Sequence, residues 1–397
     1  MPLSLAARAG LIAPSATLAM GAEAKRLKSK GIEVLDFALG EPDFATPSNI
    51  QEAAFKAIRT GQTHYTPPAG IPELRQALAD HYTHDKNLMT EPGQVIISNG
   101  AKQSIHNALM AVCGPDDEVI IPAPYWVSYA DLVKLTGATP VVITTTEEAE
   151  FKLTPSQLLA AITPRTKLLM INSPSNPTGV VYERSELAAL AHALLQTDVG
   201  VLSDEIYEQL TYGGTLPTCF AALLPGLADR TITISGVSKT YAMTGWRIGW
   251  AIAPLPVAKF MGDLQSQETS NPCSVSQLAA LEAITGPQDS VAAMKTQFQQ
   301  RRDFVLKRIE ELPGVTCLPP GGAFYAFMNI SGHLGRTLGG KKIVDSTAFC
   351  MTALSEARVA LVMGSAFGAE GYARLSFATD LKTLGQGFDA LAQFLHG

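Results

Sequence analysis

Two cations, Lys239 and Arg247, lie close together in the mostly apolar segment SGVSKTYAMTGWRIGW (residues 235–250). Most lysines lie at the surface, but this one has few polar neighbours. Burying two cations near each other costs several kcal/mol per ion unless an anion compensates. A buried lysine loses basicity and can form a Schiff base, and a guanidinium suits bidentate contact with phosphate. The segment therefore predicts an anionic ligand.

A second segment offers a place for that anion. IISNGAKQSIHNALMAV changes from a strand-like to a helical pattern at Gly100, Ala101 and Lys102. Free N–H groups and the positive end of the helix dipole make such a start a phosphate site. The alternative is an Asn-Gly turn that only links two elements.

Further polar side chains follow predicted strands. In INSPSNPTG, prolines on both sides of Asn176 keep the loop rigid and out of regular pairing. In VGVLSDEIYEQL, Asp204 follows an apolar strand, where an unpaired carboxylate is costly, and Tyr207 comes three residues later. The alternatives are a bare turn for Asn176 and a helix cap for Asp204. Open α/β sheets bind ligands at the carboxyl ends of their strands, where these side chains are expected. The side chains therefore predict one shared site.

Pyridoxal phosphate is a cofactor that uses all of these groups. Its aldehyde takes a lysine, its pyridine nitrogen needs a carboxylate, and its phosphate needs cations and free N–H groups. The sequence therefore predicts this cofactor, held by Lys239 and Asp204, and its phosphate would be the missing anion.

The elements that position these residues are short apolar runs alternating with helical patterns between about residues 95 and 253. This pattern predicts an α/β domain with a mainly parallel sheet buried on both faces. The runs are QVIISNG, DEVIIPAP, TPVVITTT, TKLLMINSP, VGVLSDE, RTITISG and WRIGWAIA.

Beyond about residue 286 the pattern changes to a long polar helix and then to strands near GVTCL, GAFYAFMNI and ARLSFA, with helices near 343–357 and 381–395. This arrangement predicts a smaller α+β domain. We expect an N-terminal arm at 1–14, a first part of the small domain at 15–46, the large cofactor-binding domain at 47–290 and the rest of the small domain at 291–397.

Composition narrows the classes of function. The 30 basic and 36 acidic residues give a net charge of −6 without a basic tract, which argues against a nucleic-acid partner. The five cysteines are scattered and never form CxxC, so neither a disulfide framework nor a metal site is expected. No signal peptide or membrane-spanning run is evident, and we expect a cytoplasmic protein without a membrane partner.

In addition, the chain resembles the class I aminotransferases of the fold type I pyridoxal phosphate superfamily, and most of all the bacterial aspartate aminotransferase group. The family's motifs occur in order along nearly the whole chain: PSATLAM, LGEPDF, HYTPPAGIPELR, NGAKQS, PAPYWVSY, NSPSNPTG, SDEIYE, SKTYAMTGWRIGW and ARLSFA. The resemblance implies an aminotransferase that moves the α-amino group of an L-amino acid, aspartate first, to a 2-oxo acid such as 2-oxoglutarate by a ping-pong mechanism.

The resemblance also implies roles around the cofactor ring. Lys239 would form the Schiff base and then move the substrate proton, and Asp204 would pair with the ring nitrogen. Tyr207 and Asn176 would hydrogen-bond the phenolic oxygen, and Trp126 would stack on the ring.

By the same resemblance, the phosphate would be held at the helix start and by three side chains, of which Tyr65 would come from a second subunit. A Tyr65 that reaches from one subunit into the active site of the other implies a homodimer with shared active sites. Arg374 would bind the substrate α-carboxylate, with Gly40, Asn176 and Trp126 nearby. The phosphate-binding residues are Gly100, Ala101, Lys102, Ser238, Arg247 and Tyr65.

The sequence departs from the family where the substrate side chain is expected. Some relatives that prefer acidic substrates have a basic residue just before PSAT or in the helix after NGAK, where this chain has Ala13 and Met110. This departure keeps aromatic or small apolar amino acids open as substrates, because a distal carboxylate needs a cation. Gly236 replaces a serine of many relatives and removes one phosphate hydroxyl.

Three other classes of function are alternatives to amino transfer. A lyase, decarboxylase or cyclopropane-forming synthase on the same fold would share the cofactor and diverge after proton removal. A nucleotide-dependent dehydrogenase lacks support, because no GxGxxG follows the first strand of the α/β region. A ligand-sensing regulator would need a DNA-binding module, which the N-terminal segment does not resemble.

Overall fold

The apolar runs between residues 95 and 252 form the central sheet. The computed structural model describes residues 3–12, 14 and 16–396. Within them, one seven-stranded sheet has the order β2-β8-β7-β6-β5-β3-β4. β8 runs antiparallel to both of its neighbours, β2 and β7, and the other neighbouring pairs are parallel. The strands are β2 (Val95–Ser98), β3 (Glu118–Ala123), β4 (Thr139–Thr144), β5 (Thr166–Asn172), β6 (Gly200–Asp204), β7 (Thr231–Gly236) and β8 (Gly249–Ile252).

Helices cover both faces of this sheet because successive strand residues point to opposite sides. Ile96 packs in one core with α4 (Ala101–Val112), α5 (Tyr129–Leu135) and α9 (Leu255–Glu268), whereas Ile97 packs in another core on the opposite face. The helices on that face are α3 (Pro72–Asp85), α6 (Pro155–Ala161), α7 (Arg184–Leu194) and α10 (Ser274–Thr285). Burial on both sides explains why the strands are apolar almost throughout.

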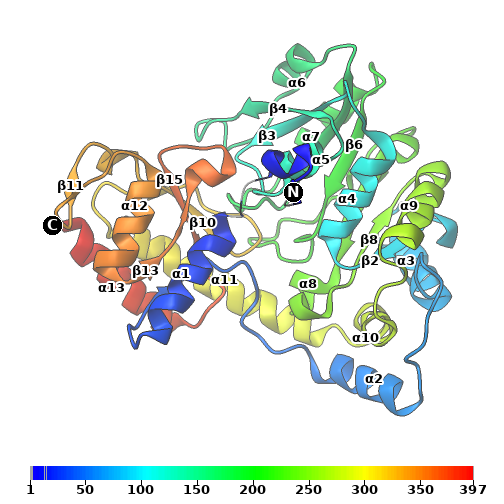
Figure 1. Ribbon diagram of the computed structural model, residues 1–397, viewed down its shortest axis with the longest axis horizontal. Helices are drawn as coiled ribbons and strands as arrows, with labels where there is room; N and C mark the ends of the chain where they lie inside the picture. The colour runs from blue at the N-terminus through cyan, green and yellow to red at the C-terminus, as the bar shows by residue number, and fades with distance from the viewer. Residues whose placement is uncertain (1–2, 13, 15, 397) are drawn as a thin grey trace.

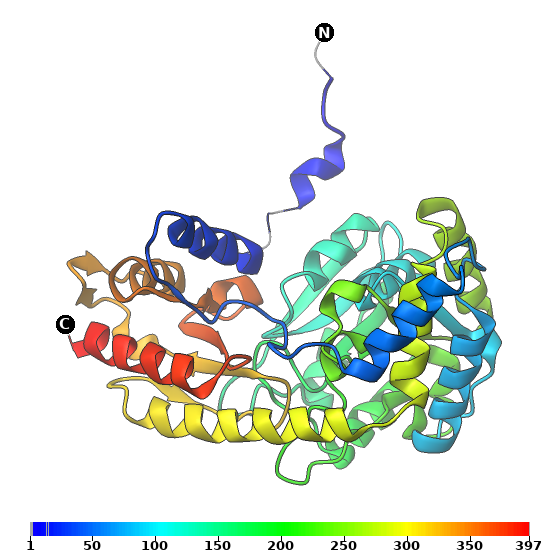
Figure 2. The same cartoon turned by 90° about the horizontal axis from the view of Figure 1, so that it is seen from below.

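A second body surrounds an antiparallel sheet with the order β14-β15-β10-β9. Figure 1 shows α12 and α13 on the side away from β2 and β8, and in Figure 2 the long helix α11 runs beneath both bodies. Its elements are α11 (Asp289–Glu310), β9 (Thr316–Cys317), β10 (Tyr325–Asn329), α12 (Ser346–Thr352), β14 (Val362–Met363), β15 (Tyr372–Ser376) and α13 (Leu381–His396).

The N-terminal segment joins this second body. Strand β1 (Leu35–Asp36) pairs in parallel with β13 (Val359–Ala360), and Met20 and Ala24 of α1 (Ala16–Ser29) lie in the same core as β10 and β15. The remaining elements include the 3-10 turn at Ala7–Leu11, α2 (Ser48–Arg59), α8 (Val237–Thr240), β11 (Thr337–Leu338), β12 (Lys341–Lys342) and a π-helical turn at Ala353–Ala357.

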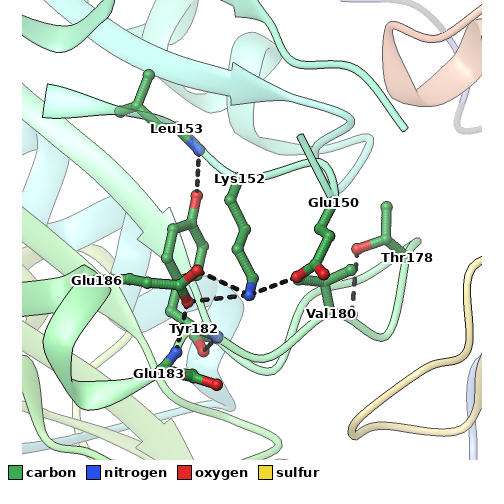
Figure 3. Close-up of polar contacts among 9 residues, drawn as sticks. Glu150, Lys152, Leu153, Thr178, Val180, Tyr182, Glu183 and Glu186 are labelled. Carbon is green, nitrogen blue, oxygen red and sulfur yellow. Dashed lines mark hydrogen bonds and ion pairs between the residues drawn. The ribbon is translucent and has the colours of Figure 1, made fainter. Parts of the chain in front are cut away.

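The loop between β4 and α6 connects the two bodies. Figure 3 shows the Lys152 ammonium between Glu150 and Glu186, at 2.7 and 2.9 Å, which fixes the loop to the start of α7. On the other side, the Glu147 carboxylate accepts hydrogen bonds from Asn329 and Tyr372 of the second sheet. This loop therefore holds β10 and β15 beside the central sheet.

The predicted fold class is confirmed: a mainly parallel sheet between helices, with a smaller α+β body. The boundaries proposed at residues 14, 46 and 290 stay a prediction. No described helix has the length and apolar character needed to cross a bilayer.

Candidate active site

A cavity of about 480 Å³ opens between the two bodies. It lies at one edge of the central sheet because β5, β6 and β7 are parallel and end there, and the antiparallel β8 begins there. The cavity is lined by many of the residues singled out in the sequence: Gly40, Ala101, Lys102, Trp126, Asn176, Asp204, Tyr207, Ser238, Lys239, Arg247 and Arg374.

Lys239 lies in the short helix α8, directly after β7. Its half-buried ammonium donates a hydrogen bond to the backbone oxygen of Gly40, at 2.6 Å. Burial lowers the pKa of Lys239 to about 8, Arg374 and Arg247 act in the same direction, and Glu41 opposes them. A sizeable fraction of the amine is therefore neutral near neutral pH, as a nucleophile or proton acceptor requires.

Asp204 ends β6 and is 4% exposed. Its carboxylate accepts hydrogen bonds from the Tyr129 hydroxyl at 2.6 Å and from the Ile206 N–H at 3.2 Å. Burial raises the pKa of Asp204 to about 6, although both hydrogen bonds lower it. The Asn172 side chain accepts from the Asn176 N–H and donates to the Asp204 backbone oxygen, so it joins the two loops.

A group of cations lies where α4 begins. The guanidinium of Arg247 donates to the backbone oxygens of Thr244 and Asn99, at 2.9 and 3.2 Å. A side chain at Gly100, where φ is +86°, would collide with this guanidinium, so glycine is required there. Arg247 is exposed in the single chain, contrary to the expectation of two buried cations.

Lys102 and Trp126 form the adjacent wall. The Lys102 ammonium lies 4.8 Å from the Trp126 ring centroid, and Tyr129 packs edge-on against the same ring. Burial, and the Arg247 cation next, lower the pKa of Lys102. Lys102 therefore presents both a backbone N–H at the helix start and a side-chain cation beside an aromatic face.

Arg374 lies in β15 and is 1% exposed. Its guanidinium donates to Asn176 Oδ1 at 2.9 Å and to the backbone oxygen of Ala38 at 2.7 Å. Its Nε is buried and has no hydrogen-bond partner among the described residues. A buried donor without a partner is costly, so this atom indicates a missing acceptor, such as a carboxylate.

Two tyrosine hydroxyls contact each other beside Arg374. The hydroxyl oxygens of Tyr207 and Tyr325 lie 2.8 Å apart, and the Arg374 guanidinium lies 4.5 Å from the Tyr325 ring centroid. Neither Tyr325 nor Tyr129 was singled out in the sequence. Tyr129 lies three residues after Trp126 in PAPYWVSY, but the contact of Tyr325 depends on the pairing of β10 with β15, which has no local signal.

Not every predicted residue lies at this cavity. Tyr65 is 91% exposed and does not line it. Met110 is half-buried in α4 and does not line it either, and Ala13 lies outside the described residues. The cavity also includes Thr17, Leu18 and Lys25 of α1, which the sequence did not indicate.

Comparisons with known proteins agree with this geometry. The model of the family "Aminotransferase class I and II" matches residues 32–391. The aspartate/prephenate aminotransferase of Cereibacter sphaeroides is 49% identical over 97% of both chains, and the aspartate aminotransferase of Geobacillus stearothermophilus is 46% identical over 99% of both. The crystal structure of the Rhizobium meliloti aspartate aminotransferase superposes with a TM-score of 0.96 at 42% identity, covering 100% of this chain and 99% of that one. The chain therefore belongs to the aminotransferase class I and II family and is an aminotransferase.

Proposed function

We propose that this aminotransferase uses pyridoxal phosphate and that its preferred amino donor is a dicarboxylic amino acid, with aspartate the first choice. The observation that carries the proposal is a cavity lined by unpaired cations. Among the described residues, no carboxylate oxygen lies within 4.0 Å of the side-chain nitrogens of Lys102, Arg247 or Arg374. Such a group favours a ligand with several negative charges.

The residues fit the cofactor in three respects. Lys239 supplies an amine of lowered pKa for the aldehyde. The buried Asp204, which forms no ion pair with another described residue, suits the protonated ring nitrogen, which would in turn lower the pKa of the carboxyl. Ser238, Arg247 and the start of α4 offer donors for the phosphate, with Gly100 leaving room for the guanidinium.

The chain's own residues then carry the proton chemistry. When bound, pyridoxal phosphate supplies an aldehyde that joins the substrate amine and a ring that withdraws electrons from the substrate Cα. The Lys239 amine accepts the proton from Cα and returns it on the cofactor side. Asp204 would hold the proton on the ring nitrogen, Tyr207 and Asn176 would hydrogen-bond the phenolic oxygen, and Trp126 would offer its ring for stacking.

Two cations suit a substrate with two carboxylates. Arg374 has its free Nε for the α-carboxylate, and Lys102 lies over Trp126 without an anionic partner and can receive a distal carboxylate. The relatives' names support this class, since aspartate and prephenate each carry two carboxylates. A 2-oxo acid such as 2-oxoglutarate would accept the amino group in the second half of a ping-pong cycle.

The proposal includes a homodimer in the cytoplasm. Tyr65 is a large aromatic residue left almost fully exposed by its own chain, which suits a side chain that completes the site of a second copy. All five cysteines are free, as in a reducing compartment.

A panel of amino donors tests the proposal. The purified protein should bind pyridoxal phosphate, and kcat/KM with 2-oxoglutarate should be highest for aspartate and much lower for alanine and phenylalanine. Lys102→Met should lower kcat/KM for aspartate by about 10–100-fold, because a charge-assisted hydrogen bond is lost, and should change alanine turnover far less.

Lys239→Ala should abolish turnover while the protein stays folded. Equal kcat/KM for aspartate and phenylalanine, or an equal loss for all donors in Lys102→Met, would contradict the dicarboxylate preference. Release of ammonia in place of amino transfer would contradict the reaction itself.

A further inference from the structure

Tyr325 occupies a central position that the proposed mechanism does not use. It is fully buried in β10, and its hydroxyl lies 2.8 Å from that of Tyr207, which belongs to the central-sheet body. Its ring lies against the guanidinium of Arg374. One side chain therefore contacts both the tyrosine on the cofactor side and the arginine on the substrate side.

Strand register places Tyr325 at this point. Arg374 pairs with Phe327 across the ladder between β10 and β15, and Tyr325 comes two residues before Phe327, so it points to the same face. The chain also leaves room for the hydroxyl: a Cβ at Gly40 would lie 2.7 Å from the Tyr325 oxygen. The backbone oxygen of Gly40 also accepts the hydrogen bond of the Lys239 ammonium, so Gly40 contacts both Tyr325 and Lys239.

We propose that Tyr325 is a positioning residue that donates its proton to Tyr207 and fixes the Arg374 guanidinium, thereby coupling the substrate-carboxylate site to the cofactor site. This inference rests on the proposed function, since it needs bound pyridoxal phosphate. Two hydroxyls that share one hydrogen bond have one donor, and Tyr207 needs its own proton for the cofactor's phenolic oxygen. Tyr325 must then be the donor between them.

Both hydroxyls are protonated. Burial raises the pKa of Tyr207 and of Tyr325, so either hydroxyl can donate in the single chain, and the cofactor's need for the Tyr207 proton selects Tyr325 as the donor. A hydroxyl that accepts a hydrogen bond is itself a stronger donor. Tyr325 thus strengthens the bond that Tyr207 offers to an oxygen bearing negative charge.

Tyr325→Phe separates the two roles, because it keeps the ring under Arg374 and removes only the hydroxyl. In the holoenzyme, the pH midpoint of the absorbance change of bound pyridoxal phosphate should rise by about half a pH unit, because a less stabilised oxyanion keeps its neighbouring proton to higher pH. The dissociation constant of succinate, a dicarboxylate that cannot be turned over, should stay within about twofold.

Tyr325→Leu removes both contacts and should, in addition, weaken succinate binding roughly tenfold. Tyr372→Phe is the matched control: it deletes a hydroxyl on the neighbouring strand, one that bonds Glu147 at 3.1 Å and does not line the cavity. Its absorbance midpoint and succinate affinity should equal those of the wild type.

A double variant tests the coupling directly. Once Tyr207→Phe has removed the donor to the cofactor, adding Tyr325→Phe should shift the midpoint no further. An unchanged midpoint in Tyr325→Phe, or shifts that add in the double variant, would overturn the inference while leaving the proposed function intact. A wild-type protein that takes up no pyridoxal phosphate would overturn both.

Discussion

Burial acts in opposite senses on the two ionisable groups at the centre of the cavity. It lowers the pKa of Lys239 to about 8 and raises that of Asp204 to about 6. In both cases the charged form is disfavoured in the cofactor-free chain. The cationic ring of the proposed cofactor would reverse this effect at Asp204, so the cost of burying the carboxylate would be recovered as binding free energy.

Asp204→Asn should therefore stabilise the cofactor-free protein and destabilise the holoenzyme. The folded-state pKa of Asp204 lies above its unfolded value of about 3.9, so its contribution to the free energy of unfolding falls as pH rises from about 4 to 6. Well above pH 6 the penalty is complete, and its removal should add on the order of 3 kcal/mol at pH 8. Urea unfolding of the cofactor-free wild type and variant at pH 4.5 and pH 8 measures the difference in their free energies of unfolding. The same difference at both pH values would contradict this prediction.

At the scale of elements, the loop after β6 is held by contacts on its side away from the cavity. Asp204 and Tyr207 face the cavity, whereas Glu205 and Glu208 face the opposite side. Glu205 accepts from the Ser203 hydroxyl and the Phe220 N–H, and burial raises its pKa to about 7. Glu208 pairs with Lys86, whose side chain is 8% exposed. The loop geometry therefore depends on an ion pair outside the cavity.

Lys86→Met should destabilise the protein by about 3–5 kcal/mol, because it leaves a buried carboxylate without its cation. Lys134→Met is the control: Lys134 forms a partly exposed pair with Asp131 at 3.2 Å, and its loss should change stability by less than about 1 kcal/mol. Thermal unfolding of the two variants side by side is the measurement. Similar melting temperatures would show that the ion pair does not hold the loop.

The sequence predicted elements whose signal is local. Strands such as β5 and β6 have apolar residues on both faces. Asn176 comes four residues after β5, and Asp204 is the last residue of β6, so the sequence indicated both the sheet edge and the polar residues at it. The pairing of β1 with β13 could not be predicted, because two-residue strands far apart in sequence leave no periodic pattern. The role of Tyr325 was not predicted for a related reason: strand register determines its neighbours, and the segment GAFYAFMNI contains no signal for that register.

At the scale of the whole molecule, the cavity combines segments from both ends of the chain. Leu18 and Gly40 come from the N-terminal segment, and Arg374 lies 24 residues from the end of the 397-residue chain, counting its own position. Tyr65, by contrast, is 91% exposed and does not line this cavity. Its exposure predicts that a second copy completes the site.

Mixed dimers test this exchange. Lys239→Ala and Tyr65→Ala homodimers should both be impaired, but a purified heterodimer of the two chains has one site with both wild-type residues. We expect about half of the wild-type activity per dimer, because both defects fall in the other site. If Tyr65 served its own chain, neither site would be intact and the heterodimer would be no better than Tyr65→Ala.

The position of β15 has a consequence for the order of folding. The hydrogen bond from Arg374 to the backbone oxygen of Ala38 joins residues 336 positions apart in the sequence. Because contacts of such long separation cost loop-closure entropy until the intervening segments are ordered, we expect the cavity to be among the last parts of the molecule to form.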